Sequence, residues 1–236
     1  FFIKRIEGCF YNVVGLPLHK LYQMLARVNV RIFAVLLLPL LFLSGCSTEY
    51  NLATRQVESY YYSTDREVTL GQNIDRSIRK EPEFKFADDP LEVKRVQDIG
   101  KKIVAVCDRK DIDYHFDVLQ DDEINAVSLP GGYIYINSGL IEKVDNDDEL
   151  AAVIAHEVSH IVARHSIKKL QASNLYTLVR LVSVAAPGSS GEVGAAADAA
   201  FTELLLGYSR EDELLADELG ARYLKLAGYN PRAMID

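Results

Sequence analysis

One apolar helix constrains this chain more than any other feature of its sequence. Residues 147–165 carry apolar side chains in nearly every direction around a helical axis, which is typical of a helix in the middle of a domain. His156 and His160 are four residues apart, so their imidazoles lie on one face and can hold one metal ion. Glu157 is turned by about 100° from His156, within reach of a water on that metal. Because ionisable groups are costly in a core unless they are paired or bound to a metal, we predict a metal site here.

The other histidines do not complete this site. A catalytic zinc ion usually takes three protein ligands and keeps one position open for water. His165 follows His160 by five residues, so on a continuous helix it points about 140° away. His19 has no neighbouring pattern, and His115 alternates with apolar residues, as on the surface of a strand. The alternative interpretation of the motif is that its two histidines are core residues with ordinary hydrogen bonds.

Two acidic side chains on a second helix are better candidates for the missing ligand. A helix is predicted over residues 209–228, with a serine cap at its start and a glycine at its end. Glu213 and Asp217 fall within the apolar arc of this helix, where an amphipathic helix should have no charge. We expect Glu213 to be the third metal ligand and Asp217 to accept a hydrogen bond from a ligand histidine. The alternative is that one of them pairs with Arg164 or Arg210.

Three motifs together resemble one peptidase family. They are His-Glu-Val-Ser-His at residues 156–160, Tyr-Ser-Arg-Glu-Asp-Glu-Leu-Leu-Ala-Asp at residues 208–217, and Asn-Ala-Val-Ser-Leu-Pro-Gly-Gly-Tyr-Ile-Tyr at residues 125–135. In this order they look like the metallopeptidase family of the CAAX prenyl protease and the HtpX heat-shock protease, and in particular its soluble bacterial lipoprotein members. The resemblance runs from about residue 65 to residue 236.

The resemblance implies a fold, a ligand set and a reaction. The implied fold is a gluzincin-like α+β domain, mainly helical, with a short β-sheet beside the active-site helix. One Zn²⁺ per chain would be held by His156, His160 and Glu213, with Asp217 orienting a ligand histidine. The implied reaction is hydrolysis of peptide bonds by a zinc-activated water, with Glu157 as general base.

Two predicted strands lie before the histidine motif. Residues 124–128 and 133–136 have the apolar pattern of strands, and the breaker-rich residues 129–132 join them. Gluzincins present a strand edge beside the zinc, to which substrate backbone adds as an extra strand. The resemblance places Asn125 and Ala126 at this edge. The alternative is an ordinary sheet in which Asn125 is a turn residue.

The rest of the domain before these strands reads as two helices and a strand. Helices are expected at about residues 65–79 and 90–107, where apolar residues recur with helical spacing. Residues 114–118 alternate as in a half-buried strand. Cys107 has no partner cysteine in the domain, so a buried free thiol is expected there.

The start of the chain resembles a bacterial lipoprotein signal. Met24 is the first methionine, and we expect residues 1–23 to be a gene-model artefact upstream of the true start. Residues 24–45 contain a basic segment, then an apolar run too short to span a bilayer, as in a signal peptide. Residues 43–46 resemble a lipobox, so we expect cleavage before Cys46 and acylation of that residue. The alternative is a short uncleaved membrane anchor.

The mature chain is expected to be a tethered domain. Residues 46–64 are polar and suit a tether, and residues 65–236 form the zinc metallopeptidase domain. The lipid on Cys46 would supply membrane affinity. The resemblance to Gram-negative lipoproteins implies that Ser47 after it favours the outer membrane facing the periplasm, in the bacterial cell envelope. A net charge of −8, with 34 acidic and 26 basic residues, argues against a nucleic-acid partner. Because Pro231 suits a further helix start, we expect the C-terminus to be truncated.

The segment between the two metal-binding helices is expected to be a helical hairpin. Residues 167–186 and 195–206 are apolar, and the Pro- and Gly-rich residues 187–191 separate them. Both runs are too short and too charged to span a membrane. We expect residues 166–208 to gate the cleft, with a flap that contacts the membrane surface as the alternative.

These observations predict a lipid-anchored metalloendopeptidase of the bacterial envelope. Its expected substrates are misfolded or misassembled envelope proteins, and Tyr208 and Arg210 are candidate donors to the reaction's oxyanion. The alternative is a zinc-binding chaperone or assembly factor for outer-membrane proteins with little proteolytic activity. An intact Glu157 favours the enzyme, because a purely structural zinc site has no use for a general base there.

Overall fold

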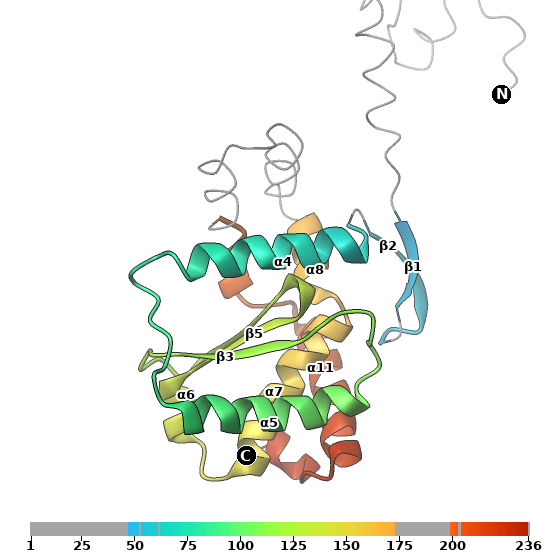
Figure 1. Ribbon diagram of the computed structural model, residues 1–236. Coiled ribbons are helices and arrows are strands. Elements are labelled where there is room, and N and C mark those ends of the chain that lie inside the picture. The colour runs from blue at the N-terminus through green and yellow to red at the C-terminus, as the bar shows by residue number, and fades with distance from the viewer. Residues whose placement is uncertain (1–46, 52, 61, 173–198, 203, 236) are drawn as a thin grey trace, which may run out of the picture. The chain divides into compact units, whose positions relative to one another are not determined.

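Helices surround a short β-sheet in the part of the chain that can be described (Figure 1). This confirms the predicted α+β, mainly helical class. All elements below belong to one unit, Cys46–Asp236. No helix within the described residues is long and apolar enough to cross a membrane. The computed structural model describes residues 47–51, 53–60, 62–172, 199–202 and 204–235.

The sheet has three strands, with β5 in its centre. β3 (His115–Leu119) pairs with β5 (Tyr133–Asn137) in parallel, and β4 (Ala126–Leu129) pairs with β5 antiparallel. The order β3-β5-β4 makes β4 an edge strand. The connection between β4 and β5 is the tight turn η1 (Pro130–Gly132), whose two glycines have φ of 73° and 98°. The breaker-rich turn was therefore predicted correctly, because only glycine adopts such angles at little cost.

Two hydrophobic clusters cover the two faces of the sheet. Ile134 and Ile136 of β5 belong to the cluster that contains residues of α5, α7 and α11, whereas Tyr135 belongs to the cluster that contains residues of α4 and α8. This alternation follows from the two-residue period of a strand. The helices have the bounds α4 (Thr64–Ile78), α5 (Pro90–Val106), α6 (Ser138–Lys143), α7 (Asp147–Val162), α8 (His165–Ala172) and α11 (Arg210–Ala227).

Helix α7 is buried along most of its length, as its sequence predicted. Its first backbone N–H groups are capped by the side chain of Asn146. The helix was expected to continue through His165, and this was wrong. α7 ends at Val162, and Arg164 adopts a left-handed conformation with φ of 58° before α8 begins.

A buried ion network holds Arg164 in that conformation. The Glu67 carboxylate, 1% exposed, accepts hydrogen bonds of 2.9 Å from Nη1 and Nη2 of Arg109 and one of 2.9 Å from Arg164 Nε. Arg109 also donates to the carbonyl of Ile161 at 3.0 Å. These bonds join α4 to the end of α7. They offset the roughly 1–2 kcal/mol that a left-handed residue costs.

The described part of residues 46–64 is not the free tether that the polarity of this segment suggested. Ser47–Asn51 (β1) and Gln56–Tyr60 (β2) form an antiparallel hairpin. The Asn51 side chain donates to a carbonyl at the end of α7 at 3.2 Å, and the Tyr60 side chain is 1% exposed. Local polarity could not reveal this packing, because the partners of the hairpin are distant in sequence.

Helix α11 packs against α7. Ser209 caps its start and Gly228 ends it with φ of 85°, as the sequence predicted. Gly220 lies where the helices meet, since a Cβ there would be 3.4 Å from the backbone nitrogen of His156. A larger side chain would push the two helices apart.

Other expectations have different outcomes. Cys107 is a buried free thiol, as predicted. The helix expected from Pro231 is a short 3₁₀ turn, η2 (Pro231–Met234). The proposed artefact, signal peptide and lipidated Cys46, together with most of the hairpin at residues 166–208, lie outside the described residues.

Candidate metal centre

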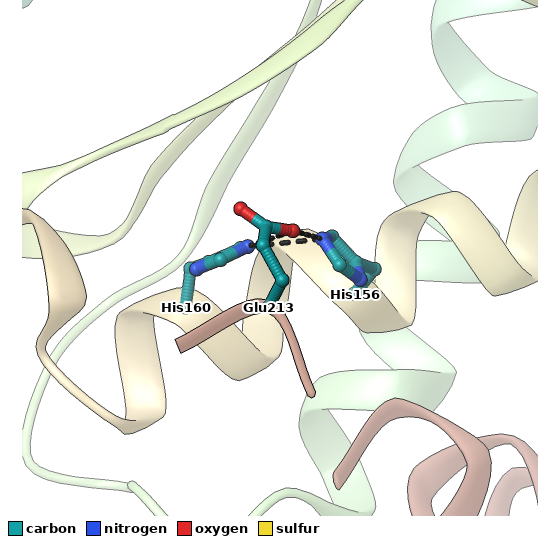
Figure 2. Close-up of side chains that lie close together, drawn as sticks. All are labelled: His156, His160 and Glu213. Carbon is teal, nitrogen blue, oxygen red and sulfur yellow. Dashed lines mark hydrogen bonds and ion pairs between the residues drawn. The ribbon is translucent and has the colours of Figure 1, made fainter. Parts of the chain in front are cut away.

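The structure brings His156, His160 and Glu213 together. Figure 2 shows both imidazoles and the carboxylate turned toward one another, the histidines from α7 and Glu213 from the start of α11. The two Nε2 atoms are 2.9 Å apart, and Glu213 Oε2 lies 3.2 Å from His156 Nε2 and 3.8 Å from His160 Nε2. Within the described part of the chain, these residues form a group whose ligand atoms all lie within 4.8 Å of one another.

This geometry fits a tetrahedral metal ion. Zn–N and Zn–O bonds of about 2.0–2.1 Å in a tetrahedron put ligand atoms roughly 3.3 Å apart. The three observed separations, 2.9, 3.2 and 3.8 Å, lie on both sides of that value. Two imidazole nitrogens and a carboxylate are also ligand types that zinc prefers. The residues present therefore fit a zinc ion.

Each histidine is held through its other ring nitrogen. His156 Nδ1 lies 2.9 Å from Asp217 Oδ1, on the next turn of α11 after Glu213. His160 Nδ1 lies 2.8 Å from His165 Nδ1. The expectation that His165 points away was wrong, because the helix breaks at the preceding residue and the ring turns back. His165 is nevertheless outside the group of converging ligand atoms.

Both buried imidazoles are in their neutral form at neutral pH. Burial, together with the neighbouring His156 and His165, lowers the pKa of His160 to about 2. Burial lowers the pKa of His165 to about 4, although the charge of Asp212 acts to raise it. Neutral imidazole is the form that binds a metal.

Glu157 lies beside the three converging side chains. It is 8% exposed, and its burial raises the pKa of its carboxyl, while His156 and Ser128 act to lower it. A carboxyl with a raised pKa is a stronger base than an exposed one, which suits proton transfer near neutral pH.

A cavity of about 200 Å³ joins this group to the edge strand β4. Asn125 and Ala126, the residues expected to meet a substrate, both line it. Asn125 accepts a hydrogen bond from Asn137 of β5 at 3.0 Å. The backbone N–H and C=O groups alternate in direction along an edge strand. Because those of Asn125 face β5, those of Ala126 and Ser128 point away from β5. The full lining is Asn125, Ala126, Val127, Ser128, His156, Glu157, His160, Leu204, Leu205, Gly207, Tyr208 and Glu213.

A second cavity, of about 510 Å³, is also lined by His156. Asp217 lines it, together with Ala152 and Val153 of α7 and Met234 of η2. His156 is thus the residue that the two cavities share.

The two candidate oxyanion donors are placed differently. The Tyr208 ring stacks on His160, with centroids 4.2 Å apart, and its hydroxyl donates to the outward carbonyl of Ser128 at 3.3 Å. Burial raises the pKa of Tyr208, so the phenol keeps its proton. Arg210 is exposed and does not line the cavity.

The sequence did not reveal His165 and Ser128 as parts of this site. His165 was dismissed because it lies about 140° from His160 on a continuous helix, and no glycine or proline in the sequence signals the break at Arg164. Ser128 lies within the motif of the edge strand, and the outward direction of its carbonyl depends on the pairing register with β5.

The chain is similar to proteases from bacteria and mitochondria. It is 29% identical over 182 residues to the beta-barrel assembly-enhancing protease of Yersinia pestis, which covers 73% of this chain and 37% of the relative. It is 33% identical over 141 residues to the mitochondrial metalloendopeptidase OMA1 of Schizosaccharomyces pombe, a match that covers 58% of this chain and 40% of the relative. For OMA1 of Saccharomyces cerevisiae the identity is 29% over 188 residues, and the match covers 74% of this chain and 53% of the relative. The chain thus spans less than two thirds of the length of each of these relatives.

Two family models match different parts of the chain. Residues 1–28, outside the described part, match the model described as Maf-like protein. Residues 90–236, more than half of the chain, match the model described as Peptidase family M48. They include the histidine motif, the edge strand and the helix of Glu213. The chain therefore belongs to peptidase family M48.

Proposed function

We propose that this chain is a zinc-dependent metalloendopeptidase. The observation that carries the proposal is the convergence of His156, His160 and Glu213 at tetrahedral spacing, with Glu157 buried beside them. Membership in a peptidase family supports the same conclusion. A bound zinc ion would polarise the scissile carbonyl and make water more acidic.

The chain's own residues perform the remaining steps. Glu157 accepts the proton of the attacking water and passes it to the leaving amine, because its raised pKa suits both transfers. Asp217 accepts the Nδ1–H of His156 and keeps its Nε2 directed at the metal position. Of the two candidate oxyanion donors we favour Tyr208, whose protonated hydroxyl would exchange its hydrogen bond to the Ser128 carbonyl for one to the oxyanion.

An extended substrate is proposed to pair with β4. The backbone N–H and C=O of Ala126 point away from β5, whereas Tyr208 already occupies the outward carbonyl of Ser128. Asn125 lies at the start of this edge. The substrate would add as an antiparallel or parallel strand. Because this pairing needs an extended backbone with free N–H and C=O groups, it selects unfolded over folded chains.

The place of action is proposed to be the bacterial cell envelope. The lipobox-like residues before Cys46 support export and lipid anchoring of the chain. The location that we favour is the outer membrane, with the chain facing the periplasm. The bacterial relative named above is a beta-barrel assembly-enhancing protease, which supports misfolded or misassembled envelope proteins as substrates.

Zinc content and cleavage of unfolded casein test this proposal when measured together on the full chain. Wild type should hold one zinc and cut. Glu157→Gln should hold zinc and lose at least about a hundredfold in rate, since it keeps the shape of the side chain without its basicity. If both bind zinc and neither cuts, a zinc-binding chaperone or assembly factor is the better interpretation. If wild type binds no zinc, the proposed metal centre is wrong.

A further inference from the structure

The ring of His165 lies directly behind the proposed ligand His160. The two Nδ1 atoms are 2.8 Å apart, and the ring centroids are 5.0 Å apart at 69°. His165 is 0% exposed and His160 is 2% exposed, so no water competes for this contact. Burying a polar imidazole costs free energy unless its ring nitrogens find polar partners, so the contact with His160 explains why a histidine lies here.

The contact allows one arrangement of protons when His160 binds a metal. Two nitrogens at 2.8 Å form a hydrogen bond only if one carries a proton and the other a lone pair. His160 Nε2 faces His156 and Glu213 and must keep its lone pair to be a ligand. Its proton is therefore on Nδ1, and His165 Nδ1 is the acceptor.

Asp212 completes this chain of contacts. The remaining proton of neutral His165 is then on Nε2, which lies 3.3 Å from Asp212 Oδ1 but makes no hydrogen bond in this geometry, so Asp212 acts on it through its charge. The other oxygen of Asp212 accepts a 2.8 Å hydrogen bond from Ser209 Oγ, at the start of α11. A carboxylate fixed in this way favours the His165 tautomer with the proton on Nε2.

The break between α7 and α8 makes the contact possible. On a continuous helix a residue five positions after His160 lies about 140° away from it. The left-handed Arg164, with φ of 58°, reverses the chain and returns His165 to the same side. Glu67 holds Arg164 in this conformation through a 2.9 Å hydrogen bond to Nε.

We propose that His165 is a positioning residue of the metal centre, which accepts the Nδ1–H of His160 and thereby fixes the tautomer and ring plane of that ligand. The nearby charge of Asp212 favours the same tautomer of His165. The inference rests on the proposed zinc site. The two ligand histidines then differ in kind: His156 is oriented by the exposed carboxylate of Asp217, and His160 by a buried neutral imidazole.

Zinc affinity of the full chain tests this role without reference to proteolysis. His165→Phe keeps a ring and removes the acceptor, whereas His165→Asn supplies an amide oxygen near the position of Nδ1. Competition with a chromophoric chelator should show that His165→Phe binds zinc about 10- to 100-fold more weakly. His165→Asn should recover most of that loss. Equal affinity in wild type and His165→Phe, or equal losses in both variants, would overturn the proposal.

A spectroscopic measurement on wild type decides the question even if a variant does not fold. In the zinc-loaded chain with ¹⁵N-labelled histidine, a scalar coupling across the hydrogen bond should join the Nδ1 nuclei of His160 and His165. His165 should carry its proton on Nε2. If zinc is bound and the coupling is absent, the role of His165 fails and the zinc site stands. If wild type binds no zinc, the metal centre fails and this inference with it.

Discussion

The carboxyl of Glu157 sits in a helix whose other side chains are largely apolar and buried. Burial raises its pKa, while the proximity of His156 and Ser128 acts to lower it. The two effects oppose each other, which is the usual way in which a carboxyl becomes a base for chemistry near neutral pH. Its place beside the cavity, rather than its residue type alone, therefore supports the assigned role.

Asp217 offers a test of how an exposed partner supports a ligand histidine. Asp217→Ala removes the acceptor of His156 Nδ1, at 2.9 Å, on a side chain that is 55% exposed. Because water can replace this acceptor, we expect zinc affinity to fall by about tenfold, the low end for such partners. Isothermal titration or chelator competition measures it.

The matched control for Asp217 lies one residue further along the same helix. Glu218 is exposed and does not line either cavity beside His156. Glu218→Ala should leave zinc affinity unchanged, since it removes a similar charge without a contact to a ligand. Equal losses in both variants would show that the effect comes from net charge and not from the hydrogen bond.

At the scale of elements, the edge strand β4 determines how a substrate can bind. Ala126→Pro removes an outward backbone N–H at a position where an edge strand tolerates proline. We expect kcat/KM for casein to fall about fivefold, corresponding to one lost hydrogen bond of roughly 1 kcal/mol. Zinc content should not change. Ala126→Val keeps the N–H, so an equal loss in that variant would argue against strand pairing.

The hairpin of β1 and β2 carries a pH-dependent contribution to stability. Burial acts to raise the pKa of Glu58, but hydrogen bonds from Tyr60, Asn51, Lys168 and Thr54 outweigh it and lower the pKa from 4.5 to about 2. A lowered carboxyl pKa stabilises the folded state above 4.5, and this stabilisation is lost as pH falls toward 2.

Urea unfolding between pH 6 and pH 2 measures this contribution. The free energy of unfolding of wild type should exceed that of Glu58→Gln at pH 6. The difference should shrink as pH falls through the window between the two pKa values. A difference that is independent of pH would mean that Glu58 contributes through packing rather than through its charge.

At the scale of the whole molecule, the buried ion network joins segments that are distant in sequence. Glu67 of α4 binds Arg109 after α5 and Arg164 after α7, all three nearly inaccessible to water. Glu67→Gln leaves two buried guanidinium groups without this carboxylate. We expect the free energy of unfolding to fall by about 3–5 kcal/mol, because a broken buried pair leaves uncompensated charge.

Chemical denaturation of the metal-free chain measures the effect of Glu67→Gln. Glu83→Gln, at an exposed position between α4 and α5, is the control and should change stability by less than about 0.5 kcal/mol. A loss below about 1 kcal/mol in Glu67→Gln would show that other carboxylates compensate for the missing charge. Because Glu67 also holds Arg164, the same variant should weaken zinc binding through His165.

The sequence by itself determined the local parts of this protein. The period of apolar residues predicted the main helices, the glycines of η1 predicted the turn, and Ser209 and Gly228 predicted the limits of α11. It also indicated the three converging side chains, since a spacing of four residues on a helix and acidic residues in an apolar arc are local properties. Such features depend on neighbours along the chain.

Only the tertiary structure decided what depends on distant partners. Strands β1 and β2, in the polar stretch before α4, pack as a hairpin because Asn51 donates to a carbonyl at the end of α7 and the Tyr60 ring lies under the guanidinium of Arg164. The helix breaks at Arg164 because Glu67, far away in sequence, offsets the cost of a left-handed residue. That break brings His165 against His160, although on one continuous helix they would face apart. Long-range ion pairs outweigh local helix preference here, and no periodicity in the sequence records them.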